Sequence, residues 1–280
     1  MVKTRNRRGV ALILVLSLLV LLGVVAAEVG SRARAEGQML MALKSRAAAR
    51  YAAESGVFLA RTSIAQLVDS APEATDRATA FRRLDSLNRS LRHQAIGNTL
   101  FDVAILDLNA RIDLNLASQR TLRNLFHEFV PDDRAATVAA ALKAEPIARF
   151  GELARVPGGD DALALAVAPY VTIWGDGIVN INSAPEAVLA ALPGIGPAVA
   201  RTIVQRRDAG ETFSSPDEFR RPGPGTATLD GFPPMTVAPS RLMVVSRGWL
   251  NGSPTAHEIQ AVYVIVGTRL TLQSWEERDR

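Results

Sequence analysis

The most prominent pattern in the chain is an apolar run from Val10 to Ala27, in which only Ser17 and Gly23 depart from Leu, Val, Ile and Ala. At about 1.5 Å per helical residue, this run spans roughly 27 Å, close to the thickness of one hydrocarbon core. The basic residues that precede it are Lys3, Arg5, Arg7 and Arg8. Because such basic blocks stay in the cytoplasm, the pattern predicts a membrane helix with the rest of the chain on the far side.

Residues 28–68 continue the helical pattern without a proline, but the pattern becomes amphipathic. Positions three or four apart form one face, which contains Leu40, Leu43, Ala47, Tyr51, Ser55, Phe58 and Thr62. Basic side chains supply much of the opposite surface. We therefore expect one long helix, whose first half lies in the membrane and whose second half packs against a soluble domain.

Strand patterns lie on both sides of a long helical region. The strands are expected at 100–107, 242–249, 255–266 and 270–275. A polar helical segment at 76–93 precedes the first strand, and a loop rich in proline and glycine at 220–239 precedes the second. Asn251-Gly252 is typical of a hairpin turn between the second and third strands. This order predicts an antiparallel sheet that is divided in sequence by a helical insertion.

An internal repeat organises the helical region. Residues 111–117 recur 67 positions later as residues 178–184. The matched positions include Asn115 with Asn182, Leu122 with Leu189, and Leu125 with Leu192. Each copy begins with an extended segment that ends at the asparagine, and a helix follows. Ser118 is a candidate cap for the first helix, and Ser183 is one for the second, with Pro185 in the first turn. Further helices are expected at 133–143 and 198–207. The repeat therefore predicts two small helical modules of similar plan.

The second copy contains a turn, Leu192-Pro193-Gly194-Ile195-Gly196, that resembles the turn of a helix-hairpin-helix motif. In that motif, the residues corresponding to Gly194, Ile195 and Gly196 let backbone N–H groups at a helix start hold a phosphate. The basic side chains that follow are Arg201, Arg206 and Arg207. Membrane-anchored DNA receptors of the competence type resemble this layout, so a DNA receptor is the alternative function for this chain.

Three features argue against DNA binding. The first copy has residues 126–131, which lack glycine, where the turn should stand. Acidic residues follow the second copy: Asp208, Glu211, Asp217 and Glu218. The formal net charge of the chain is +4, and four basic residues precede Gly9, so the remainder is close to neutral. We therefore expect a structural hairpin and no nucleic-acid ligand.

The border between the basic block and the apolar run resembles a class III, type IV pilin-like signal, because Arg8-Gly9 stands directly before the run. In that family a prepilin peptidase cuts after the glycine on the cytoplasmic side, and the apolar helix is retained. The resemblance implies cleavage between Gly9 and Val10 and methylation of the Val10 amine. An uncleaved signal anchor and a cleaved signal peptide are the alternatives, although the length of the run disfavours the second.

Leu14 is the fifth residue after the predicted cut, where most pilin-like subunits carry glutamate. A carboxylate in hydrocarbon costs about 2.5–3.5 kcal/mol, so it needs a partner, which in that family is the N-terminal ammonium of a neighbouring subunit. Leucine has nothing to neutralise. This departure resembles the protein K family of the type II secretion pathway, a minor pseudopilin at the filament tip. The closing Trp275-Glu276 also resembles the last strand of that family.

The resemblance implies an α+β fold in which a type IV pilin-like long N-terminal helix packs on an antiparallel sheet. A large inserted helical domain would contain two SAM-like or helix-hairpin-helix-like modules. The implied segments are a leader at 1–9, a transmembrane part at 10–27, the rest of the helix and the start of the pilin-like domain at 28–107, an inserted domain at 108–240 with repeats at about 108–175 and 176–220, and C-terminal strands at 241–280.

The implied role is non-enzymatic. The chain would initiate or cap a pseudopilus for protein export across the outer membrane of a Gram-negative bacterium. It would cross the inner membrane once, with a cytoplasmic N-terminus and a periplasmic C-terminal domain. The implied partners are I-like and J-like minor pseudopilins, the major pseudopilin, the prepilin peptidase and the inner-membrane assembly platform.

The side chains show no catalytic or cofactor pattern. The chain has no cysteine, which excludes disulfides and thiolate sites, and its histidines at 93, 127 and 257 lack metal-ligand spacing. Asp132-Asp133 and Asp160-Asp161 are expected to cap helices or lie in solvent. Pseudopilins of this class sometimes hold calcium in acidic loops, but no segment here matches an EF-hand, so no calcium ligand is assigned and no cofactor is expected.

Overall fold

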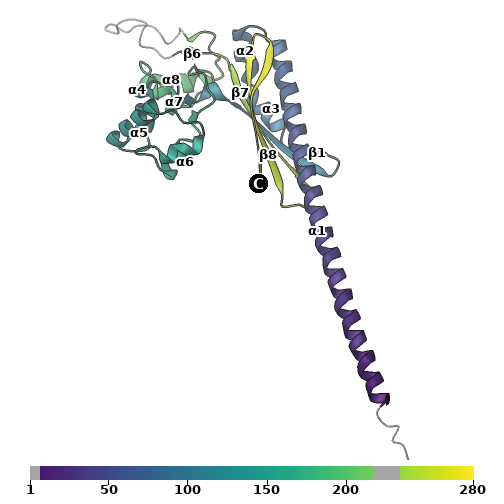
Figure 1. Ribbon diagram of the computed structural model, residues 1–280. Coiled ribbons are helices and arrows are strands. Elements are labelled where there is room, and N and C mark those ends of the chain that lie inside the picture. Colours follow the sequence, from purple (N-terminus) through teal and green to yellow (C-terminus); the bar gives the residue numbers. More distant parts are fainter. Residues whose placement is uncertain (1–6, 217–233) are drawn as a thin grey trace, which may run out of the picture.

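The chain forms one long helix, a five-stranded sheet and a helical insertion (Figure 1). The structure is a computed structural model that describes residues 7–216 and 234–280, with side chains from Leu12 onward. Helix α1 (Arg7–Ser70) has 64 residues, and its N-terminal part projects away from the rest of the molecule. By length and composition this helix can cross a membrane, and its most apolar 18-residue window is not buried against any other part of the chain. The predicted long helix is therefore present.

The sheet lies beside the C-terminal half of α1. Its strands are β1 (Gln94–Ile96), β2 (Thr99–Asp107), β7 (Arg241–Leu250), β8 (Ala256–Val266) and β9 (Arg269–Asp279). They follow the order β1-β2-β7-β8-β9, and every neighbouring pair is antiparallel. Because β2 pairs with β7, the chain leaves the sheet after Asp107 and returns beside the same strand at Arg241. The predicted α+β arrangement, a long helix with an antiparallel sheet that is divided in sequence by a helical insertion, is thus confirmed.

Helix α1 packs on one face of this sheet through small side chains. Its buried face contains Ala49, Ala52, Ala53, Val57, Ala60, Ile64 and Val68. A Cβ atom on Gly56 would lie 2.9 Å from the side chains of Phe101 and Val103, and it would also collide with Ser246. The helix therefore approaches the sheet too closely for any larger residue at Gly56.

The prediction of which face of α1 packs against the soluble domain is wrong. Tyr51 is 68% exposed and Phe58 is 66% exposed, so neither packs on the sheet. The row of alanines with Gly56 also recurs every three or four positions, and it is this row that faces the strands. Small side chains let the helix backbone approach closely and bury more apolar surface, whereas Tyr51 and Phe58 would hold the helix away from the sheet.

The segment between α1 and β2 also differs from expectation. In place of one helix at 76–93, the chain forms α2 (Ala74–Phe81) and α3 (Leu84–Ser90), and then the unpredicted strand β1. The break lets Phe81 reach the core between α1 and the sheet, beside Leu91, which directly follows α3. With only three residues, Gln94–Ile96, β1 is too short to show the apolar alternation by which longer strands are recognised.

The insertion consists of short helices and paired two-residue strands. The first module contains η1 (Leu108–Ala110), β3 (Ile112–Asp113), α4 (Gln119–His127), α5 (Asp132–Ala144), η2 (Phe150–Arg155), α6 (Asp161–Val167) and β4 (Val171–Thr172). The second contains β5 (Val179–Asn180), α7 (Glu186–Ala191), α8 (Gly196–Asp208) and β6 (Met235–Thr236). In each module the first strand pairs in parallel with the last, β3 with β4 and β5 with β6.

The two modules share one hydrophobic core, separate from the core between α1 and the sheet. Leu125 and Phe126 of the first module and Leu189 and Ile203 of the second belong to it, and all four are fully buried. Most of the predicted loop at 220–239, and residues 1–6 of the predicted leader, lie outside the described residues. Within that predicted loop, residues 235–236 form the short strand β6.

Candidate functional site

The asparagine that opens each module closes the same pair of hydrogen bonds. In the first module, Asn115 Nδ2 donates to the carbonyl of Ile147 at 2.9 Å, and the amide of Ile147 donates to Asn115 Oδ1 at 3.0 Å. In the second, Asn182 makes the same two bonds with the carbonyl and amide of Phe213, both at 2.9 Å. Each side chain thus holds the segment that follows the helix pair, and both amides are used within the fold.

The residues two positions earlier form matching turns. Asp113 Oδ1 accepts the backbone amide of Asn115 at 2.9 Å, and Asn180 Oδ1 accepts that of Asn182 at 3.0 Å. An acidic or amide side chain therefore sets the turn that directs each asparagine inward. The extended segment that ends at an asparagine in each copy of the repeat corresponds to this hydrogen-bonded turn in both modules.

The caps of the two modules differ. Ser118 accepts the amide of Thr121 and caps α4, as predicted. Ser183 does not cap α7, which begins after Pro185 without a side-chain cap. Instead, the Ser183 hydroxyl donates to Asp107 Oδ2 at 2.5 Å. The prediction for Ser183 is wrong because the last residue of β2 provides a carboxylate that only the folded chain brings to this position.

Asp107 joins the sheet to the second module. Its carboxylate is buried and accepts hydrogen bonds from Ser183, from Asn180 Nδ2 at 2.8 Å and from the backbone amide of Asn109 at 2.8 Å. Burial raises the pKa of Asp107 above its ordinary value, and these hydrogen bonds lower it by less. The cluster is a polar anchor that fixes the second module to the end of β2.

Two hydrogen bonds join positions related by the repeat. Asn109 Nδ2 donates to Asp176 Oδ1 at 2.9 Å, and Asn124 Nδ2 donates to the carbonyl of Ala191 at 3.1 Å; both pairs are 67 residues apart. This is the offset of the repeat, so equivalent residues of the two modules face one another. Ser240 donates to Asp176 Oδ2 at 2.6 Å, which ties the returning chain to the same junction.

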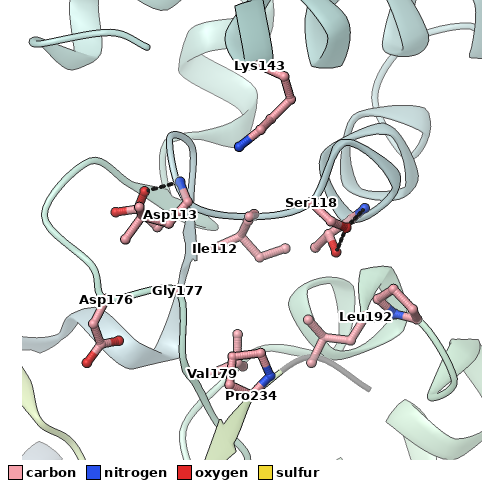
Figure 2. Close-up of a pocket in the computed structure, with 13 residues that line it drawn as sticks. Ile112, Asp113, Ser118, Lys143, Asp176, Gly177, Val179, Leu192 and Pro234 are labelled. Carbon is pink, nitrogen blue, oxygen red and sulfur yellow. Dashed lines mark hydrogen bonds between the residues drawn. The ribbon is translucent and has the colours of Figure 1, made fainter. Parts of the chain in front are cut away.

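A cavity of about 450 Å³ lies between the modules (Figure 2). Ile112 and Val179, which are equivalent in the repeat, both line it together with Leu192. Lys143 points toward the cavity, and its ammonium donates to the carbonyl of Asn115 at 2.8 Å. Asp113 accepts three backbone amides, those of Asn115, Leu116 and Gly175, so its carboxylate is occupied. These groups hold the fold together and form no nucleophile–base pair.

Both glycines of the helix-hairpin-helix-like turn adopt positive φ values. Gly194 and Gly196 have φ values of 86° and 66°, which favour glycine, and Ile195 between them is buried. Helix α8 begins at Gly196. The geometry of the turn is therefore that of the motif, and its ability to hold a phosphate depends on the charges around it.

The arginines that follow this turn are engaged within the chain. Arg201 pairs with Glu186 at 3.4 Å, and Arg206 donates to Glu211 at 2.6 Å. Arg207 is partly buried and donates to the carbonyls of Ile181 and Ala184; burial lowers its pKa from the ordinary value. These contacts reduce the positive charge available to a phosphate backbone.

At the other end of the molecule, the predicted processing residues Gly9 and Val10 lie in the first turns of α1, before Leu12, from which the side chains are described. Leu14 is 65% exposed on the projecting part of the helix. Asp160 caps α6 through the amide of Leu163, and Asp132 and Asp133 lie in the first turn of α5. Within 7–216 and 234–280, no group of three or more His, Cys, Asp or Glu side chains is arranged to hold a metal ion.

Comparison with known proteins supports the fold and the local motif. A family profile described as a helix-hairpin-helix motif matches residues 176–221. A chain of the GspK–GspI–GspJ complex from the type 2 secretion system of enterotoxigenic Escherichia coli is similar in structure, with a TM-score of 0.50 and 15% sequence identity. The similarity covers 78% of this chain and 99% of that chain. No curated protein sequence matches the chain. The chain therefore has the fold of a GspK-like, pilin-like structural neighbour.

Proposed function

We propose that this protein is a minor pseudopilin of the K type at the tip of a type II secretion pseudopilus. The observation that carries the proposal is the extent of the structural similarity, which includes nearly the whole of the neighbouring chain from the GspK–GspI–GspJ complex. The likeness extends beyond a helix on a sheet, because 78% of this chain cannot be covered without part of the helical insertion. The proposal gives this protein a structural role without enzymatic activity.

Two features of the projecting half of α1, Leu14 and the exposed apolar surface, support the proposed position of this subunit at the end of a filament. In the proposed mature chain, which begins at Val10, Leu14 stands at the fifth position and offers no carboxylate to the ammonium of a subunit ahead of it. A subunit with a neighbour on only one side does not need that ion pair. The exposed apolar surface from Leu12 onward provides the helix packing that joins it to the subunits behind.

The position of the insertion supports capping. In Figure 1 helices α4–α8 lie beside the end of the sheet that is away from the first turns of α1. If α1 is anchored in the inner membrane, the modules face the periplasmic side and add bulk at the head of the filament. Another subunit of similar shape would meet this bulk before it could stack above.

The proposal includes a division of the chain and a set of partners. Residues 1–9 are the leader, 10–27 the membrane part of α1, 28–107 and 241–280 the pilin-like domain, and 108–240 the inserted domain. The partners are I-like and J-like minor pseudopilins, the major pseudopilin, the prepilin peptidase and the assembly platform of the inner membrane. The N-terminus is cytoplasmic and the C-terminal domain periplasmic.

The test is co-expression of the full chain with an I-like and a J-like subunit and a prepilin peptidase. We expect a stoichiometric complex after detergent extraction, and N-terminal mass analysis should give a chain that begins with methylated Val10. Replacing Gly9 with leucine should leave an unprocessed, membrane-bound precursor. A mature chain that begins beyond Ala27, or that retains Met1, would contradict the proposal.

A DNA receptor is the second candidate, and the match of residues 176–221 to a helix-hairpin-helix profile is the observation in its favour. The full chain in mild detergent should nevertheless fail to shift double-stranded DNA at moderate salt, because Arg201, Arg206 and Arg207 bind groups of the chain itself. A salt-sensitive micromolar complex that Gly196→Val abolishes would favour the receptor instead.

A further inference from the structure

A cleft of about 800 Å³ separates the first module from the face of the sheet that α1 leaves open. We call it the sheet–module cleft. Its floor contains Leu106, Met243 and Val245. The charged residues of its walls are Arg111 and Arg149 on the module side, and Glu276, Glu277 and Arg278 on β9. Its volume is in the range of ligand pockets, and it is large enough for several side chains.

The floor of the cleft is apolar and partly exposed. Leu106 of β2 pairs with Met243 of β7, and Val245 follows two residues later on the same face of β7. Side chains alternate along a strand, so these three point away from the face that carries Ile105 and Val244, which is covered by α1. The floor therefore offers apolar surface that the fold itself leaves incompletely covered.

Arg111 has an unusual position in the wall. Its guanidinium is largely buried, and burial lowers its pKa from the ordinary value. Its single hydrogen bond within the described chain is a long one, 3.4 Å from Nη1 to the carbonyl of Ala168. Asp107 attracts it from a distance, but the oxygens of Asp107 accept hydrogen bonds from other groups. A guanidinium has five N–H donors and a geometry that fits a carboxylate, so most of its capacity is unused.

Arg149 and Glu276 place opposite charges on the two walls of the cleft. Arg149, exposed on the module side, forms no ion pair with any residue in the described ranges. Glu276, on the strand side, likewise has no ion-pair partner among the described side chains. The module wall thus carries two cations without carboxylate partners among the described residues. On the strand side, Glu277 pairs with Arg50 and Arg278 pairs with Glu258, so Glu276 is the charged group of that wall that remains without an ion-pair partner there.

We propose that the sheet–module cleft binds an extended acidic segment of a partner protein in which apolar and carboxylate side chains alternate. In an extended segment, successive side chains point to opposite sides. The apolar side chains would cover Leu106, Met243 and Val245, while the carboxylates would reach Arg111 and Arg149 on the module wall. This inference goes beyond the proposed tip-subunit function and does not depend on it.

The test uses the full chain in detergent and a rhodamine-labelled peptide of eight residues that alternates leucine and aspartate. The matched peptide has asparagine in place of each aspartate. Fluorescence anisotropy at low salt should show the acidic peptide binding at least about tenfold more tightly, since charge-assisted hydrogen bonds are stronger than neutral ones. Arg111→Met, which keeps the apolar stem, should weaken acidic-peptide binding about tenfold, and Arg149→Gln about two- to threefold.

Two further variants separate binding from damage to the fold. Glu276→Gln removes the strand-side carboxylate that has no ion-pair partner among the described side chains, so it should tighten binding about two- to threefold, which misfolding would not do. Arg269→Met, at the exposed start of β9 and outside the cleft, should change nothing. If Arg111→Met fails to fold, the opposite effects of Arg149→Gln and Glu276→Gln decide. Equal affinity for the two peptides, no binding at millimolar peptide, or self-association of the chain that Arg111→Met abolishes would each overturn the proposal.

Discussion

Gly248 of β7 lies directly against the backbone of α1 at Ala53. A Cβ atom at Gly248 would collide with the amide nitrogen of Ala53 and the carbonyl of Ala49, and it would lie 2.8 Å from Cβ of Ala52. Helix and strand therefore touch backbone to backbone at this point. This contact fixes the depth at which α1 sits on the sheet, and thereby the direction in which its membrane half projects.

Gly248→Val should destabilise the protein by at least about 1–3 kcal/mol, because neither backbone can yield without moving the helix. The measurement is the thermal unfolding midpoint of the full chain in detergent. Gly37→Ala is the control. Gly37 lies in α1, and a Cβ atom there would meet nothing within 4 Å. That control should leave the midpoint unchanged or slightly higher. Equal effects of the two substitutions would show that the close approach at Gly248 is absent.

The exposed face of α1 should affect assembly more than stability. Tyr51→Ser and Phe58→Ser remove exposed side chains, so each should change the free energy of unfolding by less than about 0.5 kcal/mol. Ile64→Ala in the buried face should cost about 2–5 kcal/mol. If this face contacts neighbouring subunits, the two serine variants should lower recovery of the complex with I-like and J-like subunits. A strong loss of stability in Phe58→Ser would mean that the buried face has been assigned incorrectly.

Asn182 should be more important for stability than an asparagine with a single bond. Asn182→Ala removes both hydrogen bonds between this side chain and the backbone of Phe213, and we expect a cost of about 2–3 kcal/mol. Asn124→Ala, which loses one bond to Ala191, should cost about 1 kcal/mol. Urea unfolding gives both values, and hydrogen exchange should locate the loss of protection in the second module for Asn182→Ala. Comparable costs for the two variants would contradict a special role for the paired hydrogen bonds between Asn182 and Phe213.

Acid should weaken the sheet through Glu258. Burial raises the pKa of this carboxyl, but hydrogen bonds from Arg280, Arg278 and Gln260 together lower it by more than burial raises it. The resulting pKa is about 2. The folded-state pKa is thus below the ordinary value of 4.5, so the ionised group stabilises the protein fully above about pH 4.5. This stabilisation is lost as the pH falls from about 4.5 to 2.

The measurement is the urea midpoint of the full chain across this pH range. Glu258→Gln should be less stable at pH 7 and should show a smaller fall between pH 4.5 and 2. Glu277 and Asp279 also have pKa values below their ordinary ones, owing mainly to hydrogen bonds from Trp275 and His257 respectively, so part of the fall should remain. An unchanged pH profile in Glu258→Gln would rule out this source of acid sensitivity.

Much of the fold follows from local sequence because its signals are periodic or positional. The uncharged run after Gly9, the repeat at an offset of 67 and the alternating strands near the C-terminus each depend on neighbours in the chain. The conformation of Gly194 and Gly196 was predictable for the same reason, since only glycine adopts such φ values readily. The cap at Ser118 likewise depends on residues within one turn.

The errors at α1 and at Ser183 concern contacts between distant segments. The sequence offered two faces of α1 with helical spacing, and the choice of the small-residue face required Gly248 and Ser246 of a strand almost two hundred positions away. Ser183 stands where a helix cap is expected from the sequence, but its hydroxyl donates a hydrogen bond to Asp107 instead. The sequence also could not predict that Arg111 has no carboxylate partner among the described residues. Whether an arginine forms an ion pair depends on which segments the fold brings near it.

The sequence by itself determined the membrane-length helix, the repeated modules and the division of the sheet around them, because hydrophobic period and turn chemistry act over a few residues. Only the tertiary structure decided which face of α1 is buried, which arginines are neutralised and where the sheet–module cleft opens. The physical reason is that backbone approach, burial and ion pairing depend on distances between segments, and local propensity does not specify those distances.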